Sequence, residues 1–242
     1  MKKTFLLLSF AALMCLALPS CEKNDDEKQS QEIPEIPTNE DGVCKILEVD
    51  MGGTVLWASC NLGAEKNDPK DPGYFYMWGN SEPVYFGVNI RSWWMTDYKW
   101  AFYSYGHWGL NKYSVRDGKS KLDPEDDPAV QLWGDGWRMP TADELKELLS
   151  SDCQWVGPAP WYIMYQNSGS PYYSLQLPGG HHGGGDNLLR PEILYWSSEC
   201  ILVDDPINGN FNAYALFGSS VTETCRSYGG HIRPCKSKPT QR

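Results

Sequence analysis

The chain has 242 residues, with 31 acidic against 21 basic side chains, a net charge of −10 and an aromatic content of 13%. This acidic balance argues against a nucleic-acid partner, because phosphate binding needs a basic face, and it gives no polybasic patch for lipid headgroups. The length suits one large domain or two small ones, and the aromatic content is enough for a hydrophobic core.

Residues 1–20 are predicted to be a signal peptide. Two lysines are followed by an apolar run from Thr4 to Ala17, which is shorter than the roughly 20 residues of a membrane-spanning helix. The run ends in the sequence LPSC at Leu18–Cys21, which resembles the lipobox of bacterial lipoproteins. The resemblance implies cleavage before Cys21 and acylation of this residue, so that acyl chains anchor the protein to a membrane. Ordinary secretion with cleavage nearby is the alternative.

Residues 21–41 are predicted to form a disordered tether. The stretch from Glu22 to Asp41 has eight acidic side chains, two lysines and no aromatic residue, so it cannot bury enough apolar surface to offset its ordering entropy. An acidic run directly after the acylated cysteine is similar to the surface-export signal of Bacteroidetes lipoproteins. The similarity implies an outer-membrane lipoprotein exposed at the cell surface, with a periplasm-facing anchor as the alternative.

Residues 42–242 are predicted to form one folded domain, which holds all 11 tryptophans and all 14 tyrosines. Short apolar or alternating runs predict strands at Lys45–Val49, Thr54–Cys60, Tyr173–Leu177, Tyr195–Ile201, Ala213–Phe217 and His231–Pro234. A helix is predicted at Pro140–Leu149, where Thr141 and Glu144 can form a capping box and three leucines share one face. Few helices, many short strands and long loops indicate an α+β domain.

Six cysteines remain besides Cys15 in the signal peptide and Cys21. An even number in an exported domain predicts disulfides among Cys44, Cys60, Cys153, Cys200, Cys225 and Cys235. Cys44 and Cys235 lie near the two ends of the domain, so a terminal clasp is the first hypothesis, and buried free thiols are the alternative. No CxxC pair is present, which argues against zinc and against a redox motif.

Six segments resemble, in chain order, the sequence blocks of one protein family. They are LWASCNLGA (Leu56–Ala64), GYFYMWG (Gly73–Gly79), LDPEDDPA (Leu122–Ala129), WGDGWRMPT (Trp133–Thr141), YWSS (Tyr195–Ser198) and GHIRP (Gly230–Pro234). On these residues the chain is similar to the Fibrobacter succinogenes major paralogous domain, a family common among Bacteroidetes surface lipoproteins. The chain departs from the family pattern at Asn80, where the family often has Glu, and at Cys235, where it has Val.

The resemblance implies a C-type lectin-like fold, related to formylglycine-generating enzymes and to retroelement-diversified binding proteins. In that fold the first and last strands pair, which would bring the two ends of the domain, and Cys44 and Cys235, close together. The tryptophans within the blocks are expected to be buried, namely Trp57, Trp78, Trp133, Trp137 and Trp196. The two-cysteine site of the enzymes does not carry over, because Cys235 follows the Arg233-Pro234 pair.

Aromatic residues are concentrated between positions 74 and 113. Aromatic rings stack on the apolar faces of sugars, and they also suit protein partners as rigid amphipathic contacts. Trp93, Trp94, Trp100 and Trp108 lie between the family's blocks and are therefore the predicted ligand-binding residues. The alternative is that these rings pack a long loop region onto the sheet.

A dense acidic cluster is the weak candidate for a Ca²⁺ site, because calcium prefers carboxylate and carbonyl oxygens. Its members are Asp123, Glu125, Asp126 and Asp127. The favoured alternative is a turn at Pro124 whose acids cap or solvate the next segment, with Arg138 paired to one of them. The EPN, QPD and WND motifs of sugar-binding C-type lectins are missing, so calcium-dependent lectin activity is not expected. His181 and His182 are expected to lie in a solvated glycine loop.

These observations predict a surface lipoprotein whose aromatic loops bind a glycan or a protein without catalysis and without a required cofactor. The sequence has no GxSxG, HExxH or Walker motif, which argues against an enzyme. A structural component of an envelope or pilus assembly is the first alternative. An enzyme related to the formylglycine-generating enzymes is the second.

Overall fold

A computed structural model of the chain describes residues 38–84, 98–105, 107–134, 136–149, 153–156, 161–166, 174–179, 181–182, 189–190, 192–202 and 211–239. The chain divides into two units, Met1–Glu32 and Ile33–Arg242, and every described residue belongs to the second. None of the helices in these ranges is long and apolar enough to cross a membrane. The predicted lipidation site Cys21 and most of the predicted tether lie outside the described residues.

The described part of the chain contains short strands and short helices. The strands are β1 (Glu48–Asp50), β2 (Val55–Ala58), β3 (Ala101–Ser104), β4 (His107–Leu110), β5 (Cys153–Val156), β6 (Trp161–Gln166), β7 (Ser174–Pro178), β8 (His181–His182), β9 (Leu189–Arg190), β10 (Leu194–Cys200), β11 (Asn212–Phe217), β12 (Ser220–Cys225) and β13 (Cys235–Ser237). The helices are the 3₁₀ turns η1 (Glu65–Asn67) and η2 (Pro124–Asp126), and the α-helices α1 (Pro128–Trp133) and α2 (Ala142–Leu148).

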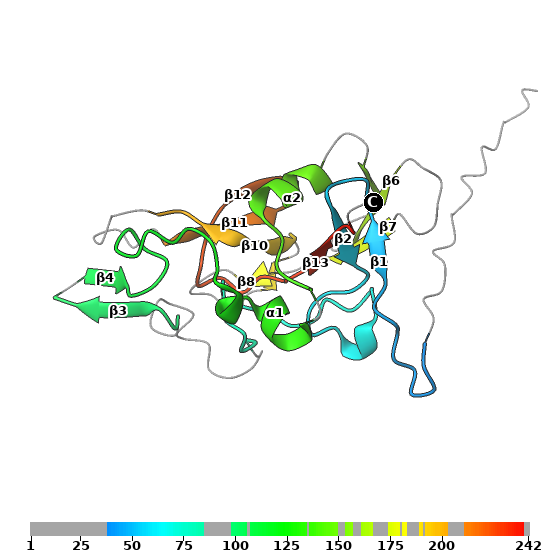
Figure 1. Cartoon of the computed structure of the whole chain (residues 1–242), viewed down its shortest axis with the longest axis horizontal. Helices are drawn as coiled ribbons and strands as arrows, with labels where there is room; N and C mark the ends of the chain where they lie inside the picture. Colours follow the sequence, from blue (N-terminus) through cyan, green and yellow to red (C-terminus); the bar gives the residue numbers. More distant parts are fainter. Residues whose placement is uncertain are drawn as a thin grey trace, which may run out of the picture. The chain divides into compact units, whose positions relative to one another are not determined.

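The strands pair into small antiparallel sheets (Figure 1). Three sheets have three strands each, in the orders β1-β2-β13, β10-β11-β12 and β5-β6-β7, and β3-β4 and β8-β9 form two-stranded pairs. Together with the two α-helices, these sheets confirm the predicted α+β class with short antiparallel strands.

The sheet β1-β2-β13 joins segments from near the two ends of the described chain. Trp57 on β2 pairs with Val49 on β1 and with Cys235 on β13. The last strand therefore pairs with the second strand rather than with the first, because β2 occupies the central position. The predicted strand at His231–Pro234 is wrong: β13 begins at Cys235, and His231 forms only an isolated bridge with Tyr195.

The cysteines do not form the predicted clasp in this structure. All five with described side chains are free thiols, namely Cys44, Cys60, Cys200, Cys225 and Cys235, and the side chain of Cys153 lies outside the described part. Cys235 lies beside Arg138, with 3.3 Å between Nη1 and Sγ, whereas the backbone of Cys44 pairs with Lys66. Neither thiol forms the predicted disulfide.

Helix α2 follows the sequence prediction closely. The side chain of Thr141 accepts a hydrogen bond from the backbone of Glu144, and the Glu144 carboxylate accepts one from the backbone of Thr141, which completes the capping box. Leu145 and Leu148 are buried in a hydrophobic cluster with Trp57. This face of the helix thus contributes apolar burial to the core.

Several tryptophans lie in the two hydrophobic clusters of the described residues. Trp78 and Trp196 are fully buried, and their indole nitrogens donate to the carbonyls of Ser197 and Tyr76 at 2.8 Å each. The burial expected for the tryptophans in the family-like blocks is confirmed for Trp57, Trp78, Trp137 and Trp196, whereas Trp133 is half-buried. Because the indole N–H groups of Trp78 and Trp196 have partners, these two large side chains are buried without losing a hydrogen bond.

Two buried arginines tie loops to the sheets. Arg226 donates to the carbonyls of Asn212, Tyr113 and Ile201 at 2.8–3.1 Å and lies against the ring of Trp78. Arg233 donates to Asn61, Ala58 and Gln176, and its burial lowers its pKa. In each case one guanidinium satisfies several carbonyl or amide oxygens that come from separate segments.

Candidate functional site

The candidate site is the β3–β4 hairpin, whose turn points away from the other sheets (Figure 1). In its register Tyr103 pairs with Trp108 and Ala101 pairs with Leu110, which places these four side chains on one face. The opposite face carries Phe102 beside Gly109 and Ser104 beside His107. Aromatic side chains therefore occupy both faces of the hairpin.

Exposure rises from the base of the hairpin to its tip. Leu110 at the base is 5% exposed, and Trp108 is half-buried against the main hydrophobic cluster. Tyr103 is 62% exposed, and Tyr105 in the turn is 99% exposed. The base thus belongs to the core, whereas the tip presents tyrosine to solvent.

The rings on the two faces pack differently. The rings of Tyr103 and Trp108 have centroids 5.1 Å apart and planes tilted by 56°, which falls within the range of favourable aromatic pairs. On the other face the ring of Phe102 covers the backbone of Gly109, so closely that a side chain at Gly109 would displace it. Each face of the hairpin is therefore covered by aromatic rings of the hairpin's own residues.

Tyr105 combines full exposure with an unfavourable backbone conformation. Its φ is +50°, in the left-handed region that costs a non-glycine residue of the order of 1 kcal/mol or more. A ring that is 99% exposed gains no packing energy in return. Backbone strain of this kind is concentrated at functional sites, so Tyr105 is the candidate for a contact with a partner outside the chain.

Trp100 lies below the hairpin and does not reach its surface. It is 7% exposed, and its ring meets the edges or faces of Trp78, Tyr98 and Tyr113 at centroid distances of 4.8–5.9 Å. This burial argues against the prediction that Trp100 contacts a ligand, because its ring packs among other buried rings of the main hydrophobic cluster. Trp108 is the one predicted tryptophan in the described part that keeps some exposure, and Trp93 and Trp94 lie outside the described residues.

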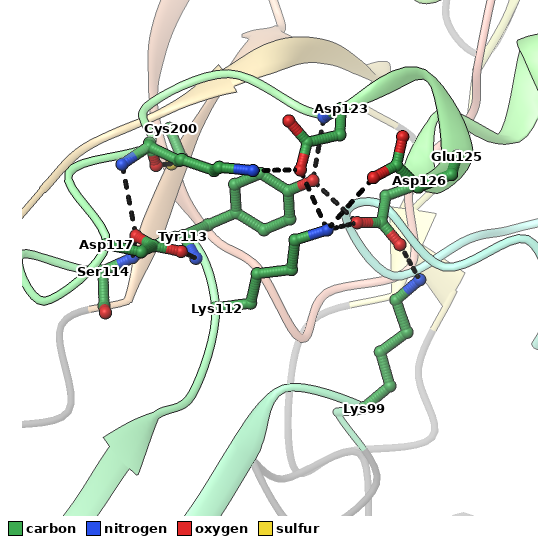
Figure 2. A network of polar contacts seen from close by, with 10 residues as sticks. Lys99, Lys112, Tyr113, Ser114, Asp117, Asp123, Glu125, Asp126 and Cys200 are labelled. Carbon is green, nitrogen blue, oxygen red and sulfur yellow. Dashed lines mark hydrogen bonds and ion pairs between the residues drawn. The ribbon is translucent and has the colours of Figure 1, made fainter.

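Two lysines at the ends of the hairpin bind one carboxylate. Lys99 precedes β3 and lies 3.2 Å from Oδ1 of Asp126, and Lys112 follows β4 and binds Oδ2 (Figure 2). The hydroxyl of Tyr113 donates to the same Oδ2 at 2.7 Å. Asp126 therefore holds the two ends of the hairpin together at their base.

Asp123 extends this network of charges. Its carboxylate lies 3.0 Å from Lys112 and 2.6 Å from Lys119. The hydrogen bonds from Lys119 and Lys112 lower the pKa of Asp123 to about 2, and the hydrogen bond to Asp126 raises the pKa of Lys112. Burial raises the pKa of Asp126, but its hydrogen bonds from Lys112 and Tyr113 leave it below its ordinary value. Asp123, Asp126 and Lys112 are therefore charged at neutral pH.

The four acids of the predicted calcium site do not converge on one point. Asp127 turns away to accept hydrogen bonds from the backbone of Ala129, Val130 and Met139, and burial raises its pKa. The Lys112 ammonium lies between the other three acids, namely Asp123, Glu125 and Asp126. In the described ranges no group of three or more His, Cys, Asp or Glu side chains is placed to hold a metal ion.

Asp127 caps helix α1, as the alternative reading of the acidic cluster expected. Arg138 forms no ion pair with an acid of this cluster in the described residues, although burial raises the pKa of Asp127 and the charge of Arg138 opposes that rise. Arg138 instead binds both oxygens of Glu144, at 2.6 and 2.8 Å, because the capping box holds this carboxylate beside it. The expected loop at His181 and His182 is wrong: their backbone forms strand β8, paired with β9, and their side chains lie outside the described part of the chain.

The buried thiols are poorly suited to nucleophilic chemistry. Burial raises the pKa of Cys60 and of Cys200 to about 11 and raises that of Cys235 further. A thiol must lose its proton to act as a nucleophile or metal ligand. These three cysteines are therefore expected to be neutral and structural.

No family model matches the chain, and no curated protein or solved structure matches it significantly. The likeness of the six sequence blocks to one family therefore stays a prediction.

Proposed function

We propose that the protein is an exported, lipid-anchored surface lipoprotein whose C-type lectin-like domain binds a glycan or a protein without catalysing a reaction. The observation that carries the binding role is the hairpin tip, where Tyr105 is 99% exposed at a φ of +50°. Backbone strain and exposed aromatic surface both cost stability or solubility. A contact between Tyr105 and a ligand would bury the exposed ring and offset the cost of the backbone strain.

Sequence and topology support the rest of the proposal. The sequence LPSC at Leu18–Cys21 supports an acylated N-terminus, and the acidic residues after it support export to the cell surface. The sheet β1-β2-β13 brings the first and last strands of the described domain into one sheet, which supports a C-type lectin-like fold, although the last strand pairs with β2 rather than with β1. A structural role in an envelope or pilus assembly remains the second candidate, because an exposed aromatic hairpin also suits a permanent contact.

The binding role is tested on the chain from Cys21 onward, with a glycan array and a pull-down from surface-protein extracts. Tyr105→Ala and Trp108→Ala are expected to abolish any signal of the parent protein. Tyr74→Ala is the matched control, because Tyr74 is 47% exposed and lies outside the hairpin. Silence of the parent protein in both assays would refute ligand binding and leave the structural role.

The anchor is tested separately by mass spectrometry of the mature protein purified from membranes. The expected product begins at Cys21 and carries acyl chains. An unmodified Cys21 on a soluble product would refute the lipoprotein assignment while leaving the binding role intact.

A further inference from the structure

We infer that the occupant of the β3–β4 hairpin is a different protein that offers an uncharged concave groove, rather than a glycan; this inference rests on the proposed binding function. The observation that supports this inference is that the hairpin projects as an arm, with aromatic rings on both faces and a fully exposed tyrosine at its tip.

The rings do not form a platform. Phe102 lies on one face, Tyr103 and Trp108 lie on the other, and the last two rings are tilted by 56° relative to each other. A flat sugar face stacked on one ring would leave the remaining rings exposed to water. A groove that surrounds the arm would instead bury aromatic surface on both faces and at the tip. Aromatic side chains buried in this way contribute most to protein binding.

The hairpin offers few of the polar groups with which proteins bind glycans. Residues 101–110 contain no carboxylate, carboxamide or guanidinium, and their polar side chains are Tyr103, Ser104, Tyr105, His107 and the indole of Trp108. Each sugar hydroxyl that loses water needs a hydrogen-bond partner, and small-ligand sites provide a few well-placed polar groups for this purpose. Tyrosine, serine, glycine and tryptophan are the residues with which antibody loops bind proteins.

Charge points to an uncharged partner surface. The whole chain has a net charge of −10, yet residues 101–110 contain no acidic or basic residue apart from His107. The nearest lysines, Lys99 and Lys112, are held by Asp126 at the base. Affinity that comes from neutral rings responds little to salt, because there are few opposite charges to screen.

The base of the hairpin reduces the cost of binding. Asp126 joins Lys99 to Lys112, and Trp108 packs partly on the core. An arm that is already ordered loses less conformational entropy when a partner closes around it. The geometry therefore suits a hairpin that is ordered before binding and inserts into a complementary groove of the partner.

The test uses the full chain in the cells that produce it, with the photo-crosslinker p-benzoylphenylalanine in place of Tyr105. This site tolerates a larger side chain because it is 99% exposed. The expected result is one discrete protein adduct, reduced at least about tenfold when Trp108→Ala is added and unchanged by Leu132→Ala, a control on the exposed side of α1. The same probe in place of Tyr74 should give no such adduct.

A parallel glycan array separates the outcomes. An array signal that needs Tyr105 and Trp108, with no protein adduct, would overturn this inference and keep the proposed binding function. Silence in both experiments would overturn both. An adduct of twice the chain's mass would identify a second copy and overturn the assignment to a different protein. Circular dichroism of the Trp108→Ala variant checks its fold, and Tyr105→Ala provides a variant that removes no buried contact.

Discussion

Lys112 and Asp126 form an ion pair at the base of the β3–β4 hairpin. Lys99, which precedes the hairpin, binds the other oxygen of the same carboxylate at 3.2 Å, and the Tyr113 hydroxyl adds a hydrogen bond of 2.7 Å. The carboxylate is largely shielded, with 14% of the Asp126 side chain exposed. A single acid thus links two segments that are separated by the whole hairpin.

Replacing Asp126 with asparagine is expected to destabilise the protein. The change removes the negative charge that Lys99, Lys112 and the Tyr113 hydroxyl contact. Loss of such a partly buried charged hydrogen bond lowers the unfolding free energy by about 1–3 kcal/mol. The free energy of unfolding in urea measures the loss. Asp143→Asn is the control. The ion pair of Asp143 with Lys146 is exposed, so this substitution is expected to leave the unfolding free energy unchanged. Equal effects of the two substitutions would contradict the role of Asp126.

Acid should weaken the same network. The pKa of Asp123 falls to about 2 from an ordinary 3.8 on folding, so its ionised form stabilises the fold above about pH 4 and this contribution is lost as the pH falls toward 2. The unfolding free energies of the parent protein and of Asp123→Asn are therefore expected to differ by a constant amount from about pH 5 to 7 and to converge below about pH 4. A difference that stays constant down to pH 2 would show that Asp123 is not bound by the lysines.

Calcium is expected to leave the thermal stability unchanged. The Lys112 ammonium already lies against Asp123 and Asp126, and a ligand stabilises a protein only where it binds the folded state. Differential scanning fluorimetry with millimolar calcium and with EGTA should give the same Tm. A rise in Tm with calcium that Asp126→Asn abolishes would restore the acidic cluster as a metal site.

Local patterns account for the features that the sequence predicts well. The capping box of Thr141 and Glu144 needs residues only three positions apart, so α2 is read directly from the chain. Strands β2, β10 and β11 lie within a residue or two of their predicted runs, because they are apolar or alternate clearly. Strand β12 is missed because Ser220–Cys225 is largely polar.

The site was harder to predict than the fold. Rings on both faces of residues 101–110 hide the alternation of an amphipathic strand, and the turn at Tyr105 lacks an Asn-Gly or Asp-Gly pair. The partners of Lys99 and Lys112 depend on tertiary contacts, which bring Asp126 to the base of the hairpin from a later segment. An excess of tyrosine, serine and glycine over charged residues at 102–109 was the one available signal.

Replacing Arg226 is expected to be among the most destabilising changes. Its guanidinium donates to three carbonyls at 2.8–3.1 Å and is almost fully buried. Arg226→Met leaves those carbonyls without their donors, which predicts a loss of about 3–5 kcal/mol, comparable to breaking a buried charged pair. Arg226→Lys should recover only a small part, because one ammonium cannot reach three separate oxygens. Urea unfolding of both variants measures the loss, and a lysine variant as stable as the parent would contradict this account.

Replacing Tyr105 with asparagine is expected to raise stability while it removes binding. Asparagine tolerates the left-handed conformation that Tyr105 adopts at a φ of +50°, so relief of strain should add about 0.5–1 kcal/mol to the unfolding free energy. The exposed ring is lost at the same time, which removes the contact proposed for the tip. Tyr103→Asn is the control with the opposite sign for stability, because Tyr103 lies in β3 and packs against Trp108, where asparagine is a poor strand residue. Thermal unfolding gives both signs in one experiment. If Tyr105→Asn instead lowers the Tm, the tyrosine stabilises the hairpin itself, and its strain is no longer evidence for a partner.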